Sequence, residues 1–411
     1  MLELWGELAL DDWGAIGTRS KAGIYYWHSK RRNLLKDDIC YSAVIFSGNK
    51  SEEQTPTTIA SKYLALWLFI RDTPQVLGIE CAKDYNNHLP FQVRLLSLRR
   101  AMPLVSHPPK EHAVRLNRMD PERYLSDEHK PKLVIVNYSL ETLAGLRNKE
   151  EIFSFLSAIP ELSIVIPYSN IQDYLHCGKV VHLKRMLYFL MSATYQEMKL
   201  SLDIFFTRMR TADETERESA LYSVLARLHD QYPYDCGIYA PLFFNNFTVE
   251  PGNAIFLPSG TVHTYLFGDC IEISTCSENI VRVGLTNLYK DVDEFLTISD
   301  FSSSTFESLT YRPTIIDEYV TSFTPPAKEF GVFKINVPAD YDYTIKGQDS
   351  CSIILVTRGS AMLEDSRIIK LGTTLFVLPY QPITFKVRKE ITIYKVYPNP
   401  DAPEGEYGNL F

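Results

Sequence analysis

Three segments of the chain place a histidine beside residue types that hold metal ions. His107 follows a short apolar run, His129 lies within the charged run 127–132, and His263 comes three residues after the turn Pro258-Ser-Gly260. Imidazoles and carboxylates from separate segments are the usual ligands of a mixed nitrogen and oxygen zinc site. His107 and His263 are therefore candidate metal ligands. The alternative is that both are structural histidines with hydrogen-bonded rings.

The segment 252–263 predicts two strands around a tight turn. An apolar run ends in Pro-x-Gly, which reverses the chain, and His263 returns on the next strand. This arrangement resembles the second signature of the cupin fold, in which the turn directs an imidazole into the mouth of a β-barrel. A strand, glycine turn and strand pattern recurs around Leu371-Gly372 and Pro379, without a following histidine.

The middle of the chain differs from its ends in proline content and in the periodicity of its apolar residues. Residues 140–231 contain few prolines and show helical periodicity, for example at Leu183, Leu187 and Leu190. We predict a mainly β protein with a helical insert: two cupin-like (jelly-roll) β-barrels plus an α-helical domain. The predicted domains are the first part of a catalytic cupin domain (1–139), the helical insert (140–231), the second part of the catalytic domain (232–312) and a C-terminal cupin-like domain without a metal site (313–411).

Composition narrows the classes of partner. The chain is 45% hydrophobic and 22% charged, which excludes a disordered protein, and its net charge of −8 argues against nucleic acid as a partner. It contains no long uncharged apolar run and no signal peptide, so we predict a cytoplasmic protein with no membrane partner. The seven cysteines are scattered and form no C-x-x-C pair, as expected of reduced thiols.

Several motifs together resemble the type I mannose-6-phosphate isomerase (phosphomannose isomerase) family. His107-Pro108 with Lys110-Glu111 is similar to the family's His-Pro-Asn-Lys-Glu, and residues 128–132 are similar to its Asn-His-Lys-Pro-Glu. The longest similar block comprises 237–241, 251–252, His263, Tyr265, 268–272, 276–279 and 281–286.

The resemblance implies a zinc-dependent aldose–ketose isomerase. Such an enzyme interconverts mannose 6-phosphate and fructose 6-phosphate through an enediol, supplies GDP-mannose synthesis, binds one zinc per chain and is a monomer. Carried over by position, the resemblance implies metal ligands at His107 and His263, catalytic roles for Arg282, Lys130 and Glu272 (a candidate general base), and substrate contacts from Tyr265, Glu278 and Arg94. Glu278 stands where the family has Asp, and Arg94 where it has Lys.

Two of the family's four metal ligands are replaced. Val105 stands where the family has Gln, and Lys132 stands where it has Glu. Valine has no lone pair to donate, and a protonated lysine repels a cation by about 4 kcal/mol per unit charge at contact and an effective dielectric of about 20. Lysine could also ligate if deprotonated, and Asp127, Glu128 or Glu111 could fill the vacant positions.

The family's phosphate contacts are altered as well. Pro103 stands in place of a serine and Leu288 in place of a lysine, although Lys290 follows two residues later. Two functions therefore remain open: an isomerase with an unusual metal site, and a catalytically impaired pseudoenzyme that binds a sugar phosphate or a protein partner. A third class, a seed-storage or transcription-factor cupin, is disfavoured by the helical insert and by the block around Arg282.

Overall fold

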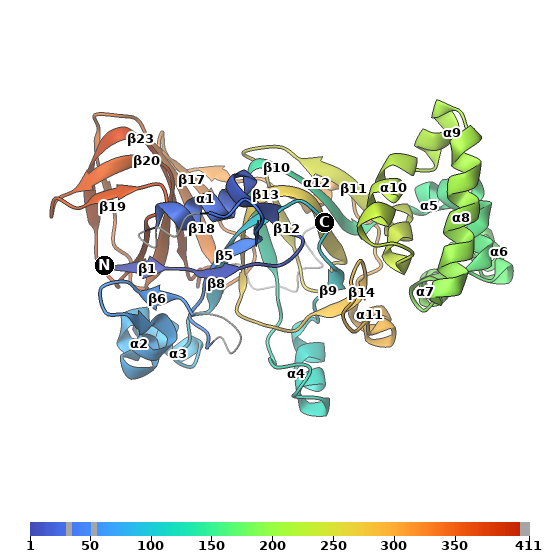
Figure 1. Ribbon diagram of the computed structural model, residues 1–411. Coiled ribbons are helices and arrows are strands. Elements are labelled where there is room, and N and C mark those ends of the chain that lie inside the picture. Colours follow the sequence, from blue (N-terminus) through green and yellow to red (C-terminus); the bar gives the residue numbers. More distant parts are fainter. Residues whose placement is uncertain (30–34, 51–55, 403–411) are drawn as a thin grey trace.

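The computed structural model describes residues 1–29, 35–50 and 56–402, which form two large β-sheets and a helical insert (Figure 1). The eleven-stranded C-terminal sheet and the helical insert lie at opposite ends of the molecule, with a ten-stranded central sheet between them. The predicted fold class, mainly β with a helical insert, is confirmed. None of the helices in the described residues is long and apolar enough to cross a bilayer.

The central sheet has the strand order β15-β12-β10-β13-β8-β5-β2, and β9, β11 and β14 pair beside this path. Its two longest strands, β10 (Lys132–Leu146) and β13 (His263–Thr275), pair with each other along most of their length. The other strands are β2 (Glu7–Ala9), β5 (Ala43–Phe46), β8 (Phe91–Leu98), β9 (Leu104–Ser106), β11 (Phe244–Val249), β12 (Ala254–Leu257), β14 (Val281–Gly284) and β15 (Thr310–Tyr311).

The C-terminal sheet takes in strands from both ends of the chain. Strand β1 (Leu2–Trp5) pairs antiparallel with β22 (Thr374–Val377), and β6 (Thr58–Ile59) and β7 (Leu64–Ala65) follow at that edge. The remaining strands are β16 (Thr314–Ile315), β17 (Val320–Phe323), β18 (Gly331–Val337), β19 (Asp342–Ile345), β20 (Ser352–Leu363), β21 (Ile368–Lys370) and β23 (Ile383–Tyr397). A short two-stranded sheet joins β3 (Ala15–Ile16) to β4 (Cys40–Tyr41).

The two predicted cupin-like units are not closed barrels, because the described strands form open sheets. The central sheet ends at the short strands β15 and β2, and the C-terminal sheet ends at β16 and β7. Strands β1, β6 and β7 lengthen the C-terminal sheet and so do not close the central one. The two sheets nevertheless share a core in which Phe91 and Ile273 of the central sheet pack with Phe376 and Val396 of the other.

Residues 140–146, at the start of the predicted insert, continue β10 and pair with β11 and β13, and the helices follow them. Helix α5 (Lys149–Ala158) begins where the side chain of Asn148 accepts a hydrogen bond from the N–H of Glu151. The insert continues with α6 (Tyr168–Cys177), α7 (Val180–Met191), α8 (Tyr195–Thr211), α9 (Glu214–Ser219) and α10 (Tyr222–Gln231), with a 3₁₀ helix η3 at Pro160–Ile164. The domain boundaries themselves remain predictions.

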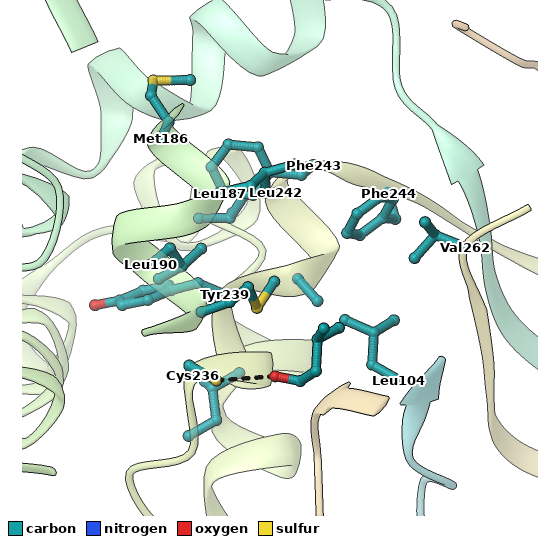
Figure 2. Close-up of a cluster of buried hydrophobic side chains, with 14 of the residues drawn as sticks. Leu104, Met186, Leu187, Leu190, Cys236, Tyr239, Leu242, Phe243, Phe244 and Val262 are labelled. Atoms are coloured by element: carbon teal, nitrogen blue, oxygen red, sulfur yellow. Dashed lines mark hydrogen bonds between the residues drawn. The ribbon is translucent and has the colours of Figure 1, made fainter. Parts of the chain in front are cut away.

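Apolar side chains join the insert to the central sheet (Figure 2). Leu187 and Leu190 on α7 are fully buried against the 3₁₀ helix η4 (Cys236–Leu242), and Leu104 and Val262 continue this core from the sheet side. The helices outside the insert are α1 (Lys21–His28), α2 (Leu66–Asp72), α3 (Ile79–Asp84), α4 (Lys110–Met119), α11 (Val292–Ile298) and α12 (Phe306–Leu309), with 3₁₀ helices η1 (Gly17–Arg19) and η2 (Pro74–Leu77).

Candidate functional site

Three neighbouring strands place His263, Val105 and Arg282 in one row. In the antiparallel pairing, Val105 on β9 lies opposite His263 on β13 and also opposite Arg282 on β14. Directly paired residues project from the same face of a sheet, so the three side chains share one face, which we call the inner face. His263 and Arg282 are separated by two strand spacings, or roughly 10 Å.

The Pro258–Gly260 turn ties the two histidine segments together. Gly260 donates its backbone N–H to the carbonyl of His107 (2.7 Å), and the hydroxyl of Ser106 donates to the carbonyl of Gly260 (3.1 Å). Gly260 has a φ of +89°, which a residue with a side chain adopts only under strain. The turn that the sequence predicts before His263 is therefore present in the backbone.

The two imidazoles lie together and share one tautomer. Their ring centroids are 5.3 Å apart, and both side chains are buried. Nδ1 of His107 lies 2.7 Å from the carbonyl oxygen of Asn279, and Nδ1 of His263 lies 2.8 Å from that of Thr261. Because a carbonyl only accepts, Nδ1 carries the proton in each ring and Nε2 keeps a lone pair. Neither Nε2 atom has a hydrogen-bond partner.

Both rings are held in the neutral form. Burial is the largest cause that lowers the pKa of His107 well below its usual range, and it lowers the pKa of His263 to about 3. The ammonium of Lys132 is the next cause in each case. Two neutral imidazoles with free Nε2 lone pairs are thus available as ligands or as hydrogen-bond acceptors.

Glu272 lies at the centre of a buried charged cluster. Its Oε2 accepts a hydrogen bond from the Tyr265 hydroxyl (2.7 Å) and lies 3.3 Å from the ammonium of Lys132, while its Oε1 lies 3.3 Å from Nη1 of Arg94. Burial alone would raise the pKa of Glu272, but Lys132, Arg94 and the Tyr265 hydroxyl together hold it below the usual range. A carboxylate bound by three donors is a weak proton acceptor, which disfavours the predicted general-base role.

Lys130 is buried beside this cluster. Its ammonium donates to the backbone carbonyl of Ser277. Burial and then the positive charges of Lys132 and Arg94 lower the pKa of Lys130 to about 7.

Arg282 has no counter-charge. Its side chain is half-buried, burial lowers its pKa, and its guanidinium forms no hydrogen bond or ion pair with any described residue. Glu278, in the loop before β14, is exposed. Lys290 does not take over the position of Leu288, because its ammonium lies 3.3 Å from Asp235 and 3.4 Å from the sulfur of Cys236.

The donor set does not fit a zinc ion. The carboxylates considered as replacement ligands lie elsewhere: Glu111 and Asp127 are exposed, and Glu128 pairs with Lys110 at 2.5 Å. Across residues 1–29, 35–50 and 56–402, no group of three or more His, Cys, Asp or Glu side chains is placed to hold a metal. Two imidazoles remain, with Val105 and an ammonium where two further donors would be needed.

One member of the inner face was missed by the sequence analysis. Glu7 on β2 shares the face with Arg94, because both pair with Ile45 on β5. Burial raises the pKa of Glu7, the charge of Arg94 lowers it, and Glu278 raises it. A single short strand at the start of the chain carries no pattern that points to this position.

A cavity of about 280 Å³ lies away from this face, where the end of α10 meets the loops after β8 and β14. Arg100, Tyr232, Tyr234 and Lys290 are among its lining residues, and none of the predicted site residues lines it. The inner face and this cavity are therefore separate features.

Comparison with known proteins agrees with the resemblance in the sequence. Residues 1–149 match the family described as phosphomannose isomerase type I, catalytic domain, and residues 323–366 match phosphomannose isomerase type I C-terminal. Mannose-6-phosphate isomerase from Rattus norvegicus is 28% identical over 403 residues, covering 93% of this chain and 95% of the relative. Mannose-6-phosphate isomerase 1 from Arabidopsis thaliana is 26% identical over 398 residues, covering 93% and 90%.

Solved structures share the fold along almost the whole chain. Mannose 6-phosphate isomerase from Salmonella typhimurium, in its apo form, superposes with a TM-score of 0.82 at 20% identity, covering 97% of this chain and 99% of that one. A mannose 6-phosphate isomerase structure bound with zinc and yttrium gives the same TM-score, identity and coverage. The motifs, the fold and the extent of these matches make the chain a divergent member of the type I phosphomannose isomerase family.

Proposed function

We propose that this chain binds a hexose 6-phosphate on the inner face and that it interconverts mannose 6-phosphate and fructose 6-phosphate. Support comes from relatives that carry the name mannose-6-phosphate isomerase and match 93% of this chain. The observation that carries the proposal is Arg282, a half-buried guanidinium without a counter-charge. A buried unpaired cation is costly, and an anionic ligand offsets that cost.

The row formed by His263, Val105 and Arg282 suits such a ligand. Arg282 and His263 flank Val105, so a phosphorylated sugar could place its anionic end at the guanidinium and its hydroxyls at the free Nε2 atoms. Lys130, buried beside the Glu272 cluster in the loop before β10, adds an amine whose pKa is about 7. Neutral imidazoles that accept hydrogen bonds are suited to sugar hydroxyls, which are donors.

Isomerisation requires functional groups that binding alone does not. It moves a proton between C2 and C1 of the sugar, so it needs a base, and it needs positive charge near the oxygens of the enediolate. With the phosphate at Arg282, Lys130 is the group that would supply this positive charge, and its pKa of about 7 leaves part of it uncharged at neutral pH. The base is harder to assign, because Glu272 is occupied by Lys132, Arg94 and Tyr265.

A second candidate function follows from that same cluster. If no group on the inner face can accept the sugar proton, the chain binds the hexose phosphate without converting it. The locked state of Glu272 favours this pseudoenzyme over the active isomerase, whereas the names of the relatives favour the isomerase.

One experiment separates the two functions. Purified full chain is assayed for conversion of mannose 6-phosphate to fructose 6-phosphate, and binding of mannose 6-phosphate, mannose and inorganic phosphate is measured by calorimetry. Arg282→Ala is compared with Arg358→Ala, an exposed arginine on β20 whose partner is Glu390.

Turnover that disappears in Arg282→Ala and survives in Arg358→Ala supports the isomerase. Binding of mannose 6-phosphate without turnover, lost only in Arg282→Ala, supports the non-catalytic binder. Absence of both turnover and binding in well-folded wild-type protein refutes the proposed ligand.

A further inference from the structure

The inner face contains a buried ammonium, that of Lys132, next to Glu272 and the ring of Tyr265. Lys132 is the first residue of β10 and pairs with Ser274 on β13. Its ammonium reaches Oε2 of Glu272, which lies two residues before Ser274 on the same strand. Both side chains are buried, with 6% of the lysine side chain and none of the glutamate exposed. A buried carboxylate is stabilised by nearby cations, and here Lys132 and Arg94 of the chain itself supply them.

The charge of the same ammonium acts on the imidazole pair. Of all the charges around His107 and His263, that of Lys132 acts most strongly on each ring. The ammonium also lies 5.8 Å from the centroid of the Tyr265 ring, whose hydroxyl binds the same glutamate. Lys132 therefore lies among the groups that would surround a divalent ion, and a divalent ion placed there would be repelled by it.

Val105 is the second substituted position on the inner face. It lies between His263 and Arg282 in the strand register and offers only a methyl-bearing, apolar surface. The two substituted positions thus act together: one removes a lone pair, and the other supplies the charge that a metal would have supplied.

We infer that the ammonium of Lys132, paired with Glu272, replaces a divalent metal ion in this chain, so that the protein folds without metal. A corollary is that two substitutions, Val105→Gln and Lys132→Glu, complete a four-donor set with His107 and His263. This inference concerns charge and metal content, and its tests do not depend on whether the sugar-phosphate proposal holds.

The first test measures metal content. Untagged full-length protein is purified, its metals are counted by mass spectrometry, and zinc affinity is measured by equilibrium dialysis. Wild type is expected to hold substoichiometric zinc and to show the same melting temperature with and without a chelator. Stoichiometric zinc in wild type, released by His107→Ala or His263→Ala, would overturn the inference.

The second test builds the metal site. Val105→Gln/Lys132→Glu is expected to bind one zinc per chain, more than about tenfold tighter than wild type, and a chelator should lower its melting temperature. A folded double variant that binds zinc no better than wild type would show that positions 105 and 132 do not face the imidazole pair as described.

The third test remains informative if the designed site fails to fold. In a double-mutant cycle, Lys132→Met and Glu272→Gln should each lower the melting temperature, because each removes one charge of the buried pair, although Arg94 still lies 3.3 Å from Glu272 in Lys132→Met. The combined variant should melt closer to wild type than the sum of the two losses. Additive losses would mean that the two charges do not balance each other, which contradicts the inference.

Discussion

Gly260 donates its backbone N–H to the carbonyl oxygen of His107 at 2.7 Å, so the turn that precedes one imidazole also holds the segment that carries the other. The φ of +89° at Gly260 makes this contact possible. The separation of the two rings is therefore set by backbone hydrogen bonding, independently of any ion between them.

We predict that Gly260→Ala destabilises the protein by about 2–3 kcal/mol, of which about 1–2 kcal/mol is backbone strain. The remainder arises because a Cβ would lie 3.2 Å from the carbonyl oxygen of Ile298. Denaturant unfolding measures the loss. The control is Gly252→Ala, where φ is +90° but no atom lies within 4 Å of the added Cβ. An equal loss in both variants would show that crowding at Gly260 contributes nothing.

A partly buried hydrogen bond between His129 and Glu329, which joins the two sheets, should make stability decrease in acid. Nε2 of His129, before β10, lies 2.8 Å from Oε1 of Glu329, before β18. Burial alone would raise the pKa of Glu329, but the hydrogen bond and charge of His129 hold it below 4.5. The unfolded carboxyl therefore binds its proton at a higher pH than the folded one, so the contribution is complete above pH 4.5 and falls as pH drops below it.

We expect Glu329→Gln to cost about 2 kcal/mol at neutral pH and less below the usual glutamate pKa. Thermal unfolding from neutral to acid pH tests this expectation, with the exposed Glu364→Gln as the control. A constant difference between wild type and Glu329→Gln across that range would mean that the pair does not form.

A buried lysine on β23 also makes stability rise with pH, but in the alkaline range. Lys395 is 4% exposed, its ammonium donates to the carbonyl of Lys346 (3.2 Å), and burial lowers its pKa from 10.5 to about 8. The unfolded chain binds this proton more tightly, so the cost is fully present below pH 8 and disappears as pH rises towards 10.5. The cost corresponds to about 3 kcal/mol at neutral pH.

Lys395→Met should therefore raise the melting temperature at pH 7 and abolish the gain in stability that wild type shows between about pH 8 and pH 10. Part of the gain is offset by the loss of the hydrogen bond to Lys346. Lys389→Met, at an exposed position on the same strand, should change neither quantity. Destabilisation by Lys395→Met at pH 7 would show that the hydrogen bond outweighs the burial of charge.

The helical insert should respond strongly to loss of a core side chain. Leu187 on α7 is fully buried against η4 (Figure 2), so Leu187→Ala removes contacts that the surroundings cannot fully replace. We expect a loss of about 3 kcal/mol in unfolding free energy. Leu200→Ala, 54% exposed on α8, should cost under about 0.5 kcal/mol. Similar losses in the two variants would argue against the described packing of α7.

Local patterns were sufficient for some elements of the fold and insufficient for others. The helices of the insert were predicted from periodicity that the structure shows as one buried face of α7. The pairing of β1 with β22 was not predicted, because residues about 370 positions apart leave no shared local pattern. The open sheets follow from the same cause, since closure depends on which distant strand takes each edge.

The sequence predicts which residues lie in the site better than it predicts their tautomers and side-chain partners. Sequence indicated His107, His263, Val105 and Lys132, and the structure brings them into one neighbourhood; their roles remain predictions. It did not indicate which tautomer the imidazoles adopt, because their partners are the backbone carbonyls of Asn279 and Thr261. Nor did it indicate that Lys132 pairs with Glu272, because a side-chain contact across two strands depends on register.

The position of β1 also has a consequence for the order of assembly. During synthesis β1 emerges about 370 residues before its partner β22, so the C-terminal sheet cannot take its final strand order until β22 has been made. Until then β1 has an unsatisfied edge, which other polypeptides in the cell could pair with. Chaperone dependence of the nascent chain, and a slow final folding phase sensitive to changes in residues 2–5, are the kinetic signs to look for.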